Sequence, residues 1–134
     1  FGITGASSLL LEADADAFVH FYRGPAFDVI IDDVFTERDG EPLRAITFDK
    51  RWGQKLLSRL TSDGLLIANF ASFSEFNQAA SLQDFSHQFA ERWLLRLGGY
   101  DNAIGAFYRC PSQGGVLLQY RQGHSAAMRE IRQL

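Results

Sequence analysis

The sequence predicts one α/β domain over residues 1–134, in which parallel strands alternate with helices and an antiparallel hairpin follows. Three observations lead to this prediction. Apolar runs of strand length alternate with amphipathic helical patterns, two of these runs end in polar side chains, and a short Pro-containing connection joins two further apolar runs. We expect three parallel strands plus a C-terminal antiparallel hairpin, with helices on both faces of the sheet.

The composition argues against two classes of partner. The 134 residues are 46% hydrophobic and 22% charged, with a formal net charge of -3. Because Lys and Arg are scattered among Asp and Glu, no basic field is available for a phosphate backbone or an anionic membrane. The sequence therefore predicts no nucleic-acid partner and no membrane association. A single cysteine, Cys110, and the lack of an apolar leader favour a cytoplasmic location.

The first predicted strand and helix lie near the start of the sequence. Residues 8–13 form a short apolar run without helical periodicity, which indicates a buried strand. Asp14 then has the position of a helix N-cap. An amphipathic pattern over residues 16–22 predicts a short helix, which Gly24 ends.

The second predicted strand, residues 27–31, ends abruptly in the acidic pair Asp32-Asp33. This pattern is typical of a central parallel strand at its carboxyl end, where ligands bind in open α/β sheets. Residues 34–44 contain a glycine and Pro42 and are irregular, so we expect a loop that covers this end of the strand.

Two longer helices flank the third predicted strand. Apolar side chains at four-residue spacing predict a helix over residues 48–60, and a Ser-Asp-Gly turn follows it. Residues 65–70 form a nearly continuous apolar run, with Asn69 at its end. A capping sequence at 81–84 and a four-residue aromatic repeat predict a long helix over residues 85–97.

The last third of the chain predicts the antiparallel hairpin and a terminal helix. Residues 102–110 and 115–120 are strand-like and are joined by the connection 111–114, which is too short for a parallel crossover. An amphipathic pattern over residues 125–134 predicts the final helix.

This order of segments resembles the spermidine synthases and their S-adenosylmethionine-dependent methyltransferase-like relatives. The family pattern Asp-(Ala/Gly)-x-x-Phe is matched by residues 14–18, and Tyr/Phe-Asp-Val-Ile-Ile-x-Asp by residues 27–33. Pro42 and the Asp63-Gly64 turn also match. The resemblance covers nearly the whole chain and implies the later strands of a Rossmann-like class I methyltransferase sheet. The family's glycine-rich first turn and its ribose-binding acidic residue are not in the sequence.

The resemblance implies a transferase that uses S-adenosylmethionine or decarboxylated S-adenosylmethionine to alkylate a small-molecule acceptor, for which an amine is one candidate. It implies adenine binding by Asp14 and the Ala15 amide. It also implies that Asp33 is the catalytic residue, which orients the attacking group and helps remove its proton. Asp14 has a second interpretation as a helix cap alone, and Asp32-Asp33 as a solvent-exposed strand end. Methyl and aminopropyl transfer both remain open, and we expect the chain alone to be inactive.

The predicted acceptor loop contains Asp32, Thr36, Glu37 and Pro42. Polyamine-making members of the family have a second aspartate where this chain has Thr36. This departure argues against putrescine as the acceptor, unless Glu37 or Asp39 supplies the missing carboxylate.

The alternative function is a non-catalytic, self-associating α/β scaffold. In the family fold the strand at residues 9–13 lies beyond two earlier strands, so without them it has no neighbour. An unpaired apolar strand associates readily, and we therefore expect a homodimer. The three histidines, at positions 20, 87 and 124, have no metal-ligand spacing, and no metal site is predicted.

Overall fold

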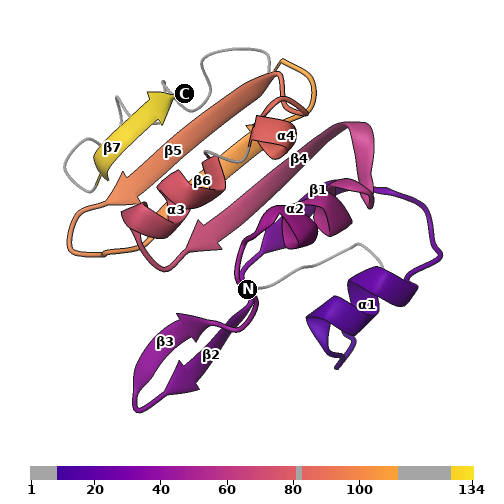
Figure 1. Cartoon of the computed structure of the whole chain (residues 1–134), viewed down its shortest axis with the longest axis horizontal. Coiled ribbons are helices and arrows are strands. Elements are labelled where there is room, and N and C mark those ends of the chain that lie inside the picture. Colours follow the sequence, from indigo (N-terminus) through magenta and orange to yellow (C-terminus); the bar gives the residue numbers. More distant parts are fainter. Residues whose placement is uncertain (1–8, 81–82, 112–127) are drawn as a thin grey trace.

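The computed structural model describes residues 9–80, 83–111 and 128–134 and shows an α/β architecture (Figure 1). The elements, in chain order, are α1 (Ala15–Phe21), β1 (Phe27–Asp32), β2 (Phe35–Arg38), β3 (Glu41–Arg44), α2 (Lys50–Leu57), β4 (Leu60–Phe70), α3 (Phe73–Ala80), α4 (Gln83–Ser86), β5 (Glu91–Leu97), β6 (Ala103–Tyr108) and β7 (Met128–Gln133).

The main sheet is mixed, with the strand order β1-β4-β6-β5-β7. β1 and β4 pair in parallel, whereas the β4·β6, β6·β5 and β5·β7 pairs are antiparallel. The α/β class and the parallel pairing of the second and third predicted strands are thus confirmed. Because β6 lies between β4 and β5 and opposes both, β4 and β5 run in the same direction. β2 and β3 form a separate two-stranded hairpin.

The principal core lies between the sheet and the helices. Alternate residues of β4, Leu66, Ala68 and Phe70, are fully buried on one face, as expected for a strand whose side chains alternate. α2, α3 and α4 add buried side chains to this core, and α1 packs against its rim. α2, α3 and α4 therefore lie on one face of the sheet, and α1 lies beyond its β1 edge (Figure 1). The apolar cluster on the other face contains no residue of a described helix, so the prediction of helices on both faces is wrong for this part of the chain.

Aspartate side chains form the N-caps of α1 and α2. The Asp14 carboxylate accepts a hydrogen bond of 2.8 Å from the Ala17 amide, which confirms its predicted capping role at α1. The Asp49 carboxylate accepts an equivalent bond of 2.8 Å from the Trp52 amide at α2. α2 is shorter than predicted, because the chain turns at Ser58 and enters β4 at Leu60.

The first predicted strand is not formed. Residues 9–13 have no regular structure, and Leu10 is 98% exposed; Ser8 lies outside the described residues. A strand needs a hydrogen-bonding neighbour, and no described strand lies beside this run. β1 is consequently an edge strand of the described sheet rather than a central one.

The predicted helix over residues 85–97 is also wrong. Its first residues belong to the short α4, and residues 91–97 form β5 between β6 and β7. Trp93 belongs to a second apolar cluster with Ala106, while Leu94 is buried in the principal core. Because β5 has apolar residues on both faces, its sequence does not alternate between apolar and polar residues. The four-residue spacing of Phe85, Phe89 and Trp93 therefore led to the prediction of a helix. Residues 81 and 82 of the proposed cap lie outside the described part.

The C-terminal predictions were partly right. The strand over residues 102–110 is confirmed as β6, but its hairpin partner is β5, through a connection in which Gly99 has a φ of 81°. The proposed strand 115–120 lies outside the described residues. Residues 128–133 form strand β7, not a helix, because they pair with the exposed edge of β5.

Residues 34–44 form a hairpin where a loop was expected. Phe35 pairs with Arg44 and Arg38 with Glu41, around a two-residue turn at Asp39-Gly40. Both turn residues have positive φ, 55° and 83°, as a type I′ turn requires. The Asp-Gly dipeptide is a strong signal for such a turn, and the prediction missed it.

Truncation of Phe70 tests the principal core. Phe70 is completely buried and its ring packs against Phe48 and Phe76, so Phe70→Ala should lower the free energy of unfolding by about 3–5 kcal/mol. Phe21→Ala is the matched control because Phe21 is 69% exposed, and a change below about 1 kcal/mol is expected. Urea unfolding measures both, and equal effects would contradict this assignment of the core.

Candidate functional site

A buried arginine joins the carboxyl ends of the two parallel strands. The Arg44 Nη2 atom lies 2.7 Å from the Asp32 Oδ2 atom at the end of β1, and both side chains are almost fully buried. Arg44 Nη1 donates to the backbone oxygen of Asn69 near the end of β4, and Nε donates to the Ile46 oxygen at 3.0 Å. Arg44 Nε also lies 3.3 Å from Glu75 Oε1 of α3. One guanidinium thus connects β3 with β1, β4 and α3.

Asp32 has a structural role in this arrangement. Its Oδ2 atom also accepts a hydrogen bond of 3.1 Å from the Trp52 indole nitrogen of α2, whereas its Oδ1 atom is buried with no partner in the described residues. A buried carboxylate is tolerated when cationic and neutral donors surround it. Asp32 therefore holds α2 and β3 against β1, and its interpretation as part of a solvent-exposed strand end is wrong, because its side chain is buried.

Asp33 points to the opposite side and is exposed. Its Oδ1 atom accepts a hydrogen bond of 2.9 Å from the Asn69 side-chain amide, and the Asn69 Oδ1 atom in turn accepts one of 3.0 Å from the Asn102 amide. The two neighbouring aspartates diverge because successive side chains of an extended chain alternate. This chain of amides orients the Asp33 carboxylate at the ends of β1 and β4.

Asp33 lines a pocket of about 420 Å³, which we call the acceptor pocket after the acceptor site that the resemblance implies for Asp33. Its wall comes from the end of β1, the hairpin, the end of β4 and the β5–β6 connection. The lining residues are Asp33, Phe35, Pro42, Asn69, Ala71, Tyr100, Asp101 and Asn102. The lining thus contains two carboxylates, two side-chain amides and two aromatic rings. Such groups bind a small cationic molecule that carries hydrogen-bond donors.

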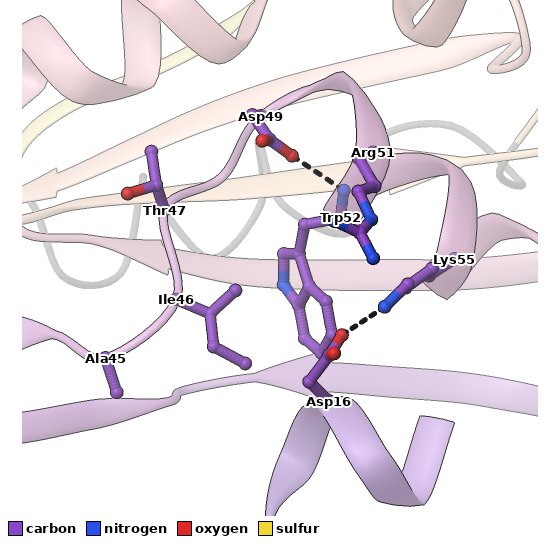
Figure 2. Close-up of a pocket in the computed structure, with 8 residues that line it drawn as sticks. All are labelled: Asp16, Ala45, Ile46, Thr47, Asp49, Arg51, Trp52 and Lys55. Carbon is purple, nitrogen blue, oxygen red and sulfur yellow. Dashed lines mark hydrogen bonds and ion pairs between the residues drawn. The ribbon is translucent and has the colours of Figure 1, made fainter. Parts of the chain in front are cut away.

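A second pocket, of about 370 Å³, lies between α1, α2 and residues 45–47 (Figure 2). Figure 2 shows the Lys55 ammonium group of α2 directed at the Asp16 carboxylate of α1, with the Trp52 indole behind them. The hydrogen bond from Lys55 holds the pKa of Asp16 below its ordinary value of 3.8. We call this the helix pocket.

The predicted adenine-binding residues lie apart from Asp33. The Asp14 carboxylate caps α1, and Ala15 is the first residue of that helix. Ala15 lines a third pocket, of about 340 Å³, together with the exposed leucines at positions 9–11. The structure does not bring Asp14 or Ala15 into the acceptor pocket, although their neighbour Asp16 lines the helix pocket.

The predicted acceptor-loop residues separate into three groups. Asp32 is buried under the hairpin, and Thr36 and Glu37 are exposed on β2, where they pair with Leu43 and Pro42. Of these four predicted residues, Pro42 alone lines the acceptor pocket.

Four further residues of the site were missed from the sequence. Tyr100, Asp101 and Asn102 lie in the β5–β6 connection, which the helical interpretation of residues 85–97 placed after a helix. The Gly-Gly pair at 98–99 between two apolar runs is the signal of that hairpin. Arg44 lies on the β2–β3 hairpin, but no local motif predicts its buried contacts with Asp32, Asn69 and Glu75, which depend on the tertiary structure.

Comparison with known proteins assigns no family to the chain. No protein-family model matches the sequence, and no curated protein matches it. Within residues 9–80, 83–111 and 128–134, no cluster of three or more His, Cys, Asp or Glu side chains is placed to hold a metal ion. In the same part of the chain, every helix is too short or too polar to cross a membrane.

The pH dependence of the α1–α2 contact follows from the lowered pKa of Asp16. A carboxyl group whose pKa is lower in the folded state stabilises the fold above its ordinary pKa of 3.8, and this contribution disappears as pH falls through the folded pKa. NMR titration should therefore show the Asp16 carboxyl titrating at a higher pH in Lys55→Met than in the unmodified protein. An unchanged titration would mean that Lys55 does not hold the carboxylate in solution.

Proposed function

We propose that this chain forms the acceptor side of a spermidine synthase-like transferase, which alkylates a small molecule with S-adenosylmethionine or its decarboxylated form. The observation that supports this function best is the acceptor pocket at the carboxyl ends of the parallel strands β1 and β4, with Asp33 held by Asn69. In open α/β sheets, ligands bind outside these strand ends. The parallel pair followed by the antiparallel β5–β6 hairpin also agrees with the Rossmann-like sheet that the resemblance implies.

The chemistry of the acceptor pocket suits an amine. Asp33 and Asp101 attract a protonated amine, and Phe35 and Tyr100 offer aromatic faces to the same charge. A protonated nitrogen has no lone pair, so the bound amine first passes a proton to Asp33 and then aligns with the carbon next to the donor sulfur. As the nitrogen–carbon bond forms, the carbon–sulfur bond of the sulfonium breaks, its electrons go to sulfur, and the product is a substituted ammonium ion. Asn69 keeps that carboxylate in place.

In this proposal the donor lies on the other side of Arg44. Residues 45–47, just after Arg44, line the helix pocket, whereas Pro42, just before it, lines the acceptor pocket. The helix pocket also adjoins the N-terminus of α1, where the resemblance places adenine against Asp14 and Ala15. The outer edge of β1 pairs with no described strand, and Ile31, on the sheet face opposite the principal core, is 68% exposed. We propose that the family's earlier strands, which carry the donor cradle, pair with this edge.

The exposed edge of β1 also supports the second candidate function, a self-associating scaffold. Val29 and Ile31 are exposed on the sheet face opposite the principal core, and Leu9, Leu10 and Leu11 are exposed without regular structure. A second copy could pair with the free edge of β1 and pack its own apolar residues against these two groups. Light scattering distinguishes the candidates, since the scaffold requires a homodimer that Ile31→Lys disrupts. A monomer would count against it.

Substitution of Asp33 tests the proposed catalytic role. In the complete protein that contains this chain, Asp33→Asn should reduce turnover by about 10²–10⁴-fold, because it removes the base and retains the side-chain shape. Asp28→Asn is the matched control, since Asp28 is exposed near the opposite end of the same strand. Unchanged turnover in Asp33→Asn would remove Asp33 from the mechanism.

Labelled donors test the reaction itself. The complete protein is incubated with S-adenosylmethionine labelled in its methyl group, or with decarboxylated S-adenosylmethionine labelled in its aminopropyl group, and a set of amines. Calorimetric titration with methylthioadenosine measures donor binding in parallel. We expect the label to move to an amine from one of the two donors. Absence of both binding and transfer would contradict the transferase proposal.

A further inference from the structure

We propose that Arg44 is the positioning residue of the acceptor pocket. In this proposal it holds the β2–β3 hairpin on the ends of β1 and β4, and so determines where Phe35, Pro42 and Asp33 lie. The name of the pocket rests on the proposed function, but the contacts of Arg44 and their test do not.

The hairpin has few contacts of its own with the body of the protein. Residues 36–43 are all exposed, and Figure 1 shows β2 and β3 projecting away from the main sheet. At its base, the Ala45 amide donates to the Val34 oxygen at 3.0 Å, which closes the hairpin on itself. Arg44 is the hairpin residue whose side chain extends into the core, and a projecting hairpin needs such an anchor.

The contacts of Arg44 reach three elements at once. Its Nη2 atom pairs with Asp32, its Nη1 atom donates to the Asn69 oxygen, and its Nε atom faces Glu75. The guanidinium carbon also lies 5.6–5.8 Å from the ring centroids of Phe35, Phe48 and Phe70. A planar group with five fixed donors can satisfy these directions together, whereas a lysine ammonium cannot.

The same contacts connect Arg44 to Asp33. Arg44 holds the backbone oxygen of Asn69, and the side chain of Asn69 donates to Asp33. Phe35, which lies against the guanidinium, lines the acceptor pocket beside Asp33. Loss of Arg44 should therefore disturb the hairpin and the Asn69–Asp33 hydrogen bond together, even when the principal core remains folded.

Two variants separate positioning from stability. Asp32→Leu/Arg44→Met removes both buried charges, and such replacements often retain or improve stability, so this variant should fold. Arg44→Lys keeps a positive charge for Asp32 but loses the geometry needed to reach Asn69 and Glu75 as well. Arg38→Met is the matched control, because Arg38 lies on the same hairpin with an exposed side chain.

The experiment is NMR without donor or acceptor, under conditions where each variant is folded. Backbone amides of residues 35–41, 43 and 44 should exchange on the order of tenfold faster in both Arg44 variants, while those of β4 keep their protection. The side-chain amide signals of Asn69 and Asn102 should shift in the same variants and stay in place in Arg38→Met. If either folded Arg44 variant retains hairpin protection and unshifted amide signals, the proposal is wrong. The result is independent of whether the protein proves to be a transferase.

Discussion

The buried ion pair between Asp32 and Arg44 is the interaction on which the arrangement of the site depends. Removing two charges from water is costly, and the cost is offset only when the remaining donors and acceptors are satisfied. Here Trp52, Ile46, Asn69 and Glu75 supply most of those partners. Removing one member of such a pair leaves an uncompensated charge, which commonly costs about 3–5 kcal/mol. The pair therefore fixes α2, α3 and the hairpin relative to the two parallel strands.

Asp32 and Asp33 have different roles because neighbouring side chains at the end of β1 point to opposite sides. Asp32 faces the helices and holds the fold together, while Asp33 faces the acceptor pocket. This division needs no additional residues, because an extended backbone directs neighbours to opposite sides. It also means that the two carboxylates are stabilised separately: Asp32 by Arg44 and Trp52, and Asp33 by Asn69.

Both the parallel and the antiparallel strand pairs of the sheet position residues that line the acceptor pocket. The parallel strands β1 and β4 bring Asp33 and Asn69 to one edge. The antiparallel pairing of β6 with β4 and β5 then places the β5–β6 connection at the same edge, with Tyr100, Asp101 and Asn102. Rigid strands thus position residues of a connection that would otherwise vary, which is common in binding sites.

The sequence by itself determined the α/β class, the cap at Asp14, and the existence of strands that contain residues 27–31 and 65–70. These depend on neighbouring residues and on periodicity. Only the tertiary structure decided that residues 91–97 are a strand, because burial on both faces removes the period that distinguishes strands from helices. It also decided that Asp32 pairs with Arg44 and that Tyr100 to Asn102 face Asp33. Such contacts join residues far apart in the chain, and their energies depend on burial that no local pattern reveals.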